Sequence, residues 1–276
     1  MSIEHFPPPR GERIGSLWVE HIDRIDSTNH ELMRRPRLWP EEAEARHPPP
    51  EGVWLVAAEQ TAGRGRRGKQ WLARPGDTMT ASFACELPPG SFRHLTAMPL
   101  VAGIVIAEYL ASQGVALGVK WPNDLCRRLA DPRRPYAKVG GILCEVRSRG
   151  EGGRLVIGCG LNLRAIPAGL VSDQPVAAVF DAFSQVDIDQ LVTGIGQALL
   201  EGSQQLLREG FVAFAARWQP LDVLGGREIR VHLASGPRDG VAVGLDGQGC
   251  LLVRYDDAPD RVEALLAEDL SVRPRT

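Results

Sequence analysis

Up to Pro220, the hydrophobic positions of the chain predict a domain of mixed strands and helices. Short apolar or alternating runs predict strands, and apolar residues spaced three and four apart predict helices. A helix is expected directly after the segment DSTN at residues 26–29, because these side chains suit an N-cap. Asp187 and Gln190 have the spacing of a capping box before another helix. The expected strands cover residues 17–25, 53–58, 78–86, 114–119, 142–146 and 155–159, and the longer expected helices cover 100–111, 187–199 and 206–218.

After Pro220 the pattern changes to short strands separated by turn residues. Asp246-Gly247 is a hairpin signal between two of them. Short strands at this spacing are typical of a small barrel. We therefore expect a large domain over residues 1–220 and a small barrel over residues 221–276. The expected strands of the barrel are 228–231, 240–245, 251–255 and 262–266.

The composition is that of an ordinary globular protein. Of the 276 residues, 43% are hydrophobic and 24% are charged, which excludes disordered and fibrous classes. The apolar run at residues 98–107 is shorter than the ~20 residues of a membrane span, so we expect a buried helix there. The first ten residues lack the basic start and apolar stretch of a secretory signal, so we expect a cytoplasmic protein with no membrane partner.

The cysteines and the net charge exclude further classes. An odd number of cysteines without paired spacing indicates neither a disulfide framework nor a zinc site, so we expect buried thiols and no metal ligands from the protein. A net charge of −2 disfavours a general nucleic-acid-binding protein. The five cysteines are Cys85, Cys126, Cys144, Cys159 and Cys250.

The basic residues are almost all arginine. Only three of the 32 are lysines, namely Lys69, Lys120 and Lys138. Where arginine is preferred this strongly, a lysine indicates a position that needs a compact ammonium group. Chance retention is the alternative explanation.

The densest charge lies in GRGRRGK at residues 63–69, which holds four cations and three glycines. Glycines let backbone amides approach a ligand, and the cations would neutralise phosphate or carboxylate. The spacing before Lys69 excludes a phosphate-binding P-loop, and the arginines within the glycine pattern disfavour a dinucleotide-binding turn. For this segment alone, a solvated basic turn and an RNA-binding patch of RGG type remain alternatives.

Two more segments place lysines near turns or glycines. KWPND at residues 120–124 follows an expected strand, the usual place for function in an open α/β sheet, and Lys138 precedes two glycines. An Asx turn with a core tryptophan and an ordinary loop lysine are the alternatives. A carboxylate and a triphosphate repel each other, so a catalyst that joins them needs concentrated positive charge and Mg²⁺. Such charge would come from Arg64, Arg66, Lys69 and Lys138.

Four motifs, in this order, resemble bacterial biotin protein ligases, the biotin–[acetyl-CoA-carboxylase] ligases. They are STN at residues 27–29, GRGRRGKQW at 63–71, KWPNDL at 120–125 and KVGGIL at 138–143. The resemblance covers roughly residues 23–163. It implies an α+β fold, with a class II synthetase-like catalytic domain on a mixed, mostly antiparallel sheet and a C-terminal SH3-like barrel. That implication replaces the doubly wound sheet that the strand ends alone suggest.

The resemblance also implies a reaction and its participants. Biotin would react with ATP, supplied with Mg²⁺, to give biotinyl-5′-AMP and pyrophosphate. The biotinyl group would then pass to a lysine of a biotin carrier protein, from acetyl-CoA carboxylase or a similar biotin enzyme.

Individual residues take implied roles by the same resemblance. Lys138 and Arg66 would be catalytic through their charge, and Asp124 would orient or deprotonate the carrier lysine. The implied biotin-binding residues are Ser27, Thr28, Asn29, Gln60, Arg64, Gly65, Arg66 and Lys138. The implied nucleotide-binding residues are Arg64, Arg66, Lys69, Trp71, Lys138 and Asn162.

The chain departs from the family pattern in three places. Lys69 stands where the family often has arginine, and residues 34–52 are longer and richer in proline than in compact members. Thirteen residues separate Asp124 from Lys138, more than compact members have, so we interpret this stretch as a local insertion. It contains Arg127, Arg128, Arg133 and Arg134.

Other functions stay open from the sequence. A lipoate or octanoyl transferase would share the scaffold, and an RNA-binding protein would use the arginine segment without catalysis. The 26 residues before Ser27 are too few for a winged helix-turn-helix, so we expect no DNA binding. The oligomeric state stays open, with a homodimer among the alternatives.

Overall fold

The computed structural model describes residues 10–45, 48–164, 166, 174–180, 187–267 and 271–275, which belong to two compact units. Strand β7 (Tyr136–Arg149) and helix α4 (Ile188–Glu209) each pass from one unit into the other. The division into domains at residue 220 stays a prediction. Unit 1 comprises Met1–Ser91, Gly140–Val171 and Ala178–Glu201, and unit 2 comprises Phe92–Val139, Ser172–Ala177 and Gly202–Thr276.

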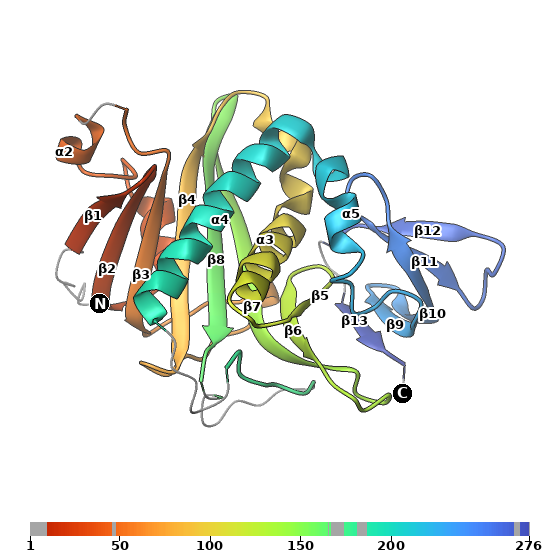
Figure 1. Cartoon of the computed structure of the whole chain (residues 1–276). Coiled ribbons are helices and arrows are strands. Elements are labelled where there is room, and N and C mark those ends of the chain that lie inside the picture. The colour runs from red at the N-terminus through yellow and green to blue at the C-terminus, as the bar shows by residue number, and fades with distance from the viewer. Residues whose placement is uncertain are drawn as a thin grey trace. The chain divides into compact units, whose positions relative to one another are not determined.

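Unit 1 is built on a sheet in which β1, β2, β3, β4, β8 and β7 lie side by side in this order (Figure 1). Strands β2 and β3 are parallel, and the other neighbouring pairs are antiparallel. Trp54 and Phe83 are fully buried on β3 and β4, whose apolar runs fit central strands covered on both faces. The bounds are β1 (Arg10–Ile14), β2 (Leu17–Ile25), β3 (Gly52–Gln60), β4 (Thr78–Leu87) and β8 (Gly152–Asn162).

Two short helices complete the described N-terminal part of unit 1: α1 (Thr28–Arg34) and α2 (Glu41–Glu44). Leu32 of α1 joins a buried apolar cluster with Ile22 of β2 and Val53 of β3. This cluster seats α1 against the sheet, which fixes the position of the residues at the start of the helix.

Unit 2 contains the buried helix α3 (Met98–Ser112) and a second sheet. The segment Ser91–Ser112 is long and apolar enough to cross a membrane by length and composition, but most of it is buried like a core helix. The indole of Trp121 is buried and donates to the carbonyl oxygen of Gly249 at 3.1 Å. The remaining elements here are β5 (Gly118–Lys120), β6 (Asp124–Arg128), α5 (Ala215–Trp218) and the short 3₁₀ helices Ser91–Ala97 and Phe211–Phe214.

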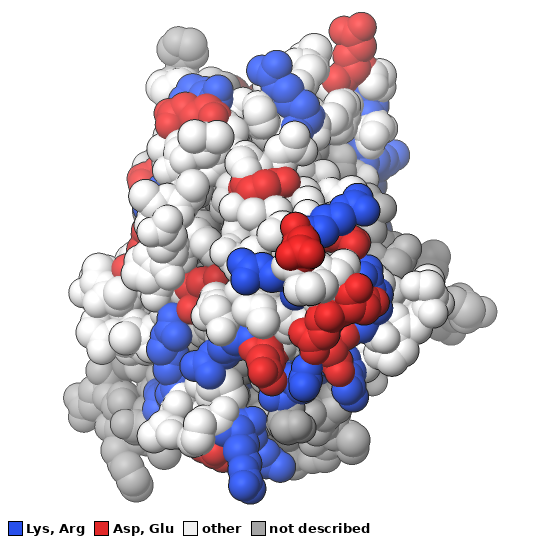
Figure 2. All heavy atoms as spheres, turned by 90° about the vertical axis from the view of Figure 1, so that its right-hand side faces the viewer, with Lys and Arg blue, Asp and Glu red and all other residues white. Residues whose placement is uncertain are grey.

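The second sheet is antiparallel throughout, in the order β12-β11-β10-β9-β13. Its core includes Val231, Val253 and Val272. Arg230 of β9 pairs with Asp239 of β10 at 2.7 Å. Basic and acidic side chains are interspersed over the face of the molecule in Figure 2. The bounds are β9 (Glu228–Leu233), β10 (Gly236–Leu245), β11 (Leu251–Tyr255), β12 (Val262–Leu265) and β13 (Ser271–Pro274).

These two sheets confirm the predicted fold class of a mixed, mostly antiparallel sheet followed by a small antiparallel one. The predicted helix over residues 206–218 is wrong. Leu206 belongs to α4, and the chain turns at Gly210, whose positive φ of 73° breaks the helix before α5. Strands β1, β6 and β13 were not predicted, because short strands at a sheet edge or beside a turn carry weak patterns.

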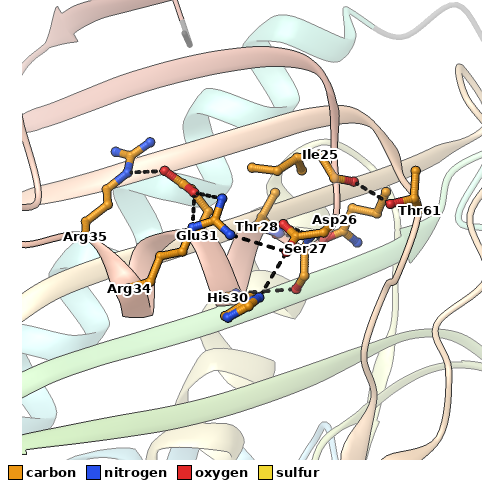
Figure 3. A network of polar contacts seen from close by, with 10 residues as sticks. Ile25, Asp26, Ser27, Thr28, His30, Glu31, Arg34, Arg35 and Thr61 are labelled. Carbon is orange, nitrogen blue, oxygen red and sulfur yellow. Dashed lines mark hydrogen bonds and ion pairs between the residues drawn. The ribbon is translucent and has the colours of Figure 1, made fainter. Parts of the chain in front are cut away.

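The first turn of α1 is fixed by local polar contacts (Figure 3). The Ser27 hydroxyl accepts from the backbone N–H of His30 at 3.4 Å, as the predicted N-cap requires. Asp26 accepts from the backbone N–H of Ser27 at 2.7 Å and contacts the His30 ring at 3.0 Å. Residues 27–29 are therefore held in one conformation.

The other end of α1 is held by a buried arginine. The Arg154 guanidinium donates to the carbonyl oxygens of Leu32 at 2.8 Å and Arg35 at 2.7 Å. It also forms an ion pair with Glu86 at 2.6 Å. Helix C-termini leave such carbonyls without partners, so Arg154 substitutes for a C-cap.

We expect Arg154→Leu to lower the free energy of unfolding by about 3 kcal/mol, because charge-assisted hydrogen bonds to buried carbonyls are lost. Urea unfolding measures this. Arg149→Leu, at an exposed position on β7, is the control. A loss for Arg154→Leu no larger than that of the control would show that α1 does not depend on this anchor.

Candidate active site

A connected set of neutral polar side chains lies at the start of α1. Gln60 Oε1 accepts from the backbone N–H of Thr28 at 2.8 Å. The Thr28 and Ser82 hydroxyls are 2.7 Å apart, and Ser82 donates to Asn29 Oδ1 at 2.6 Å. The Thr28 hydroxyl also donates to Gln60 Oε1 at 3.0 Å. Ser27, Thr28 and Asn29 are all buried.

A carboxylate links this polar set to the arginine segment. Glu145 of β7 accepts from Asn29 Nδ2 at 2.8 Å through one oxygen. Its other oxygen lies 3.3 Å from Arg64 Nη2. Glu145 is therefore the contact that joins the start of α1 to Arg64.

Residues 63–71, which we call the arginine loop, form a closed turn. Gly65 N–H donates to the Lys69 carbonyl at 2.7 Å, and Trp71 N–H donates to the Gly63 carbonyl at 2.9 Å. Arg67 has a positive φ of 57°, which is uncommon for a residue with a side chain and marks local strain. Arg64, Arg67 and Lys69 are exposed, and Arg66 is half-buried. The loop thus presents several cations on one ordered turn.

Two glycines of β8 allow close approach to the sheet. A Cβ atom at Gly158 would lie 2.3 Å from Asn29 Oδ1, and one at Gly160 would lie 2.3 Å from the Trp71 indole. Because the two glycines are two residues apart, they share one face of the strand. Asn29 and Trp71 therefore lie over the same face of β8, which also ends at the buried Asn162.

Unit 2 holds a separate charged cluster around Asp124. Lys138 Nζ lies 2.6 Å from Asp124 Oδ1, and Lys120 Nζ lies 3.8 Å from Asp124 Oδ2. Gln174 donates to Asp124 Oδ2 at 3.4 Å. Lys120 and Asp124 are buried, whereas the Lys138 side chain is 24% exposed and can reach a ligand.

The charges of this cluster set its protonation state. Burial alone would raise the pKa of Asp124, but the charges of Lys138 and Lys120 outweigh it and lower the pKa to about 2. Burial lowers the pKa of Lys120, and the charge of Asp124 opposes that effect. Asp124 is therefore a carboxylate at neutral pH.

A sequence profile described as the Biotin/lipoate A/B protein ligase family matches residues 22–162, more than half of the chain. The chain belongs to this family. It is 32% identical over 209 residues to the bifunctional ligase/repressor BirA of Escherichia coli, covering 74% of this chain and 62% of that protein. It is 29% identical over 245 residues to the biotin–[acetyl-CoA-carboxylase] ligase of Paracoccus denitrificans, covering 84% of this chain and 92% of that protein.

Comparison with a solved structure confirms that this chain has the fold of a biotin protein ligase. The biotin protein ligase of Aquifex aeolicus in complex with biotin and ATP superimposes with a TM-score of 0.72 at 24% identity. The match covers 93% of this chain and 99% of that one. The predicted resemblance is thereby confirmed.

In this ligase-family chain, the predicted site residues fall into two groups. Lys138 and Asp124 form an ion pair in unit 2. Lys138 lies within strand β7, not in a loop. The members in unit 1 are Ser27, Thr28, Asn29, Gln60, Arg64, Gly65, Arg66, Lys69, Trp71 and Asn162.

The sequence prediction missed Ser82, Glu145, Gly158 and Gly160. Ser82 is fully buried on β4, which also carries Thr78 and Thr80, so its hydroxyl gave no distinct signal. The two glycines alternate on β8, and alternation in a strand indicates a shared face. Glu145 gave no signal, because its partners lie far away in the sequence. The five cysteines are free thiols, and the described residues contain no cluster of three metal-ligating side chains.

The depressed pKa of Asp124 predicts a pH-dependent effect of Asp124→Asn. A folded pKa of about 2, below the ordinary 3.8, means that this carboxylate stabilises the fold above pH ~4 and loses that effect as the pH falls toward 2. We expect Asp124→Asn to cost about 2 kcal/mol of unfolding free energy at neutral pH and less at pH ~3. Urea unfolding across this range checks it, with Asp131→Asn as an exposed control. A cost that stays constant down to pH ~3 would contradict the pairing.

Proposed function

We propose that this chain is a biotin protein ligase that activates biotin with ATP and transfers it to a lysine of a biotin carrier protein. The catalytic domain over residues 1–220 would bind both substrates, and the barrel over residues 221–276 would contact the carrier or the nucleotide. Both relatives named above are described as ligases, and one is described as acting on acetyl-CoA carboxylase. The reaction belongs in the cytoplasm, where MgATP and the carboxylase are found.

The observation that carries this proposal is the buried polar set at the start of α1. Thr28, Asn29 and Gln60 offer both donors and acceptors, which match the ureido ring of biotin. The dithiolane ring of lipoate has no N–H or carbonyl group that could hydrogen-bond to these side chains. The site therefore favours biotin over lipoate.

In the first step, a biotin carboxylate oxygen attacks the α-phosphorus of ATP, and pyrophosphate leaves. Arg64 and Arg66 would bind the carboxylate and the phosphate, and closing of the arginine loop would exclude water from the anhydride. Lys138 would stabilise the charge that develops on the phosphate oxygens. For the nucleotide, Lys69 would neutralise phosphate charge, Trp71 would stack on the adenine, and Asn162 would hold the nucleotide.

In the second step, the carrier lysine amine attacks the carbonyl carbon of the anhydride, and AMP leaves as the amide forms. Asp124 is assigned to orientation rather than to proton removal. A carboxylate with a pKa of about 2 is a weak base for a lysine ammonium, but its 2.6 Å contact holds the Lys138 amine in place.

The basic arginine loop supports an anionic ligand. Its one aromatic residue is Trp71, which disfavours RNA binding by base stacking.

The direct test is to incubate the purified protein with biotin, MgATP and the biotin carrier domain of acetyl-CoA carboxylase. We expect the mass of the carrier to increase by one biotinyl group, and we expect biotin but not lipoate to raise the thermal midpoint. A lipoylated carrier, or a midpoint raised by lipoate alone, would assign the other ligase activity. Unmodified carrier with no pyrophosphate release would refute the proposal.

A further inference from the structure

The turn between β6 and β7 is an ordered and fully exposed projection. Figure 1 shows this green connection extending beyond the two strands. Every residue from 128 to 134, which we call the β6–β7 tip, is exposed. Leu129 N–H donates to the Pro135 carbonyl at 2.8 Å, and Arg134 N–H donates to the Asp131 carbonyl at 3.1 Å. The tip is therefore a defined turn.

The base of the tip is attached to another part of unit 2. Arg128 Nη2 donates to the carbonyl oxygens of Pro220 at 3.1 Å and Asp222 at 2.8 Å. These bonds use the Arg128 side chain for structure. They leave Arg133 and Arg134 as the cations that the tip presents to solvent.

The two arginines differ from two other arginines of unit 2, Arg238 and Arg275. Arg238 and Arg275 form ion pairs with Asp257 and Asp256. Among the described residues, no acidic side chain pairs with Arg133 or Arg134. The tip contains one acid, Asp131, whose carboxylate accepts the backbone N–H of Arg133 at 2.9 Å. An exposed guanidinium group that is not paired with an acidic side chain is suited to bind a carboxylate of another molecule.

The position of the tip follows from the strands that carry it. Asp124 begins β6 and Lys138 is near the start of β7, so the tip that connects these strands starts four residues after Asp124, at Arg128, and ends four residues before Lys138, at Arg134. At about 3.3 Å per residue, the four residues from Asp124 to Arg128 place the tip about 13 Å from that pair. A globular domain of about 100 residues has a radius of gyration of about 13 Å. A carrier whose lysine reaches Lys138 is therefore wide enough to contact the tip.

We propose that Arg133 and Arg134 form a docking surface for acidic side chains that flank the target lysine of the carrier. This inference rests on the proposed ligase function. Paired charges at the rim of an interface mainly raise the association rate and fix orientation. A nucleic acid is the less favoured partner, because the tip has no aromatic residue for stacking and carries only three cations beside one acid.

The test uses the full chain with Arg133→Glu and Arg134→Glu combined. We expect the KM for the carrier domain to rise about five-fold at low ionic strength, the scale of two exposed ion pairs, with kcat unchanged. Pyrophosphate release from biotin and MgATP should match the parent, because the tip does not touch the first step. The difference should shrink as ionic strength increases from about 0.01 M to about 0.1 M, where the screening length falls from about 30 Å to about 10 Å.

Two controls separate docking from a general charge effect. Arg93→Glu with Arg208→Glu makes the same charge change at exposed positions elsewhere in unit 2 and should leave the KM for the carrier unchanged. A carrier in which an acid beside the target lysine is changed to lysine should recover its rate with the Arg133→Glu/Arg134→Glu variant.

Each other outcome overturns the proposal. The KM of the tip variant could equal that of the parent, or the control pair could raise it equally. The tip variant could instead lose binding to a single-stranded RNA or DNA 20-mer while keeping its KM for the carrier, which would assign the tip to nucleic acid. A parent protein that releases no pyrophosphate would instead refute the ligase function itself, and the docking surface with it.

Discussion

Joining a carboxylate to a triphosphate requires two anions to approach within bonding distance. In water their repulsion is screened, but in a site closed to water it is strong unless fixed positive charge offsets it. This chain places four cations in seven residues of the arginine loop. It places Lys138 beside a carboxylate in unit 2.

The two charged groups are supported differently. The arginine loop is closed by its own backbone bonds and connected through Glu145 to Asn29, so its geometry depends on the start of α1. Lys138 lies 2.6 Å from Asp124, whose pKa stays low because Lys138 and Lys120 both face it. The Asp124 carboxylate holds the Lys138 ammonium group from one side, so the other side of the ammonium group can still bind an anionic ligand. A planar guanidinium would not fit that role as compactly, which agrees with the rarity of lysine elsewhere in the chain.

Local signals predicted much of the fold. Ser27 caps α1 as expected, and the apolar runs of β3 and β4 lie close to their predicted positions. The interruption at Gly210 was missed because apolar spacing continues across it, whereas the positive φ there is a property of the backbone. The chemistry of the site was predicted mainly through motifs. Ser82 and Glu145 escaped because their roles arise from contacts with residues more than 50 positions away.

The central claim is that Arg66 and Lys138 act on the same adenylate, and a double-mutant cycle on biotinyl-AMP formation tests it most directly. Rates are measured for the parent, Arg66→Ala, Lys138→Ala and the double variant, with circular dichroism confirming that each is folded. We expect each single change to slow the step about 100-fold, and the double change to slow it by clearly less than the product of the two. Effects that multiply fully, or a parental rate for Lys138→Ala, would contradict the account.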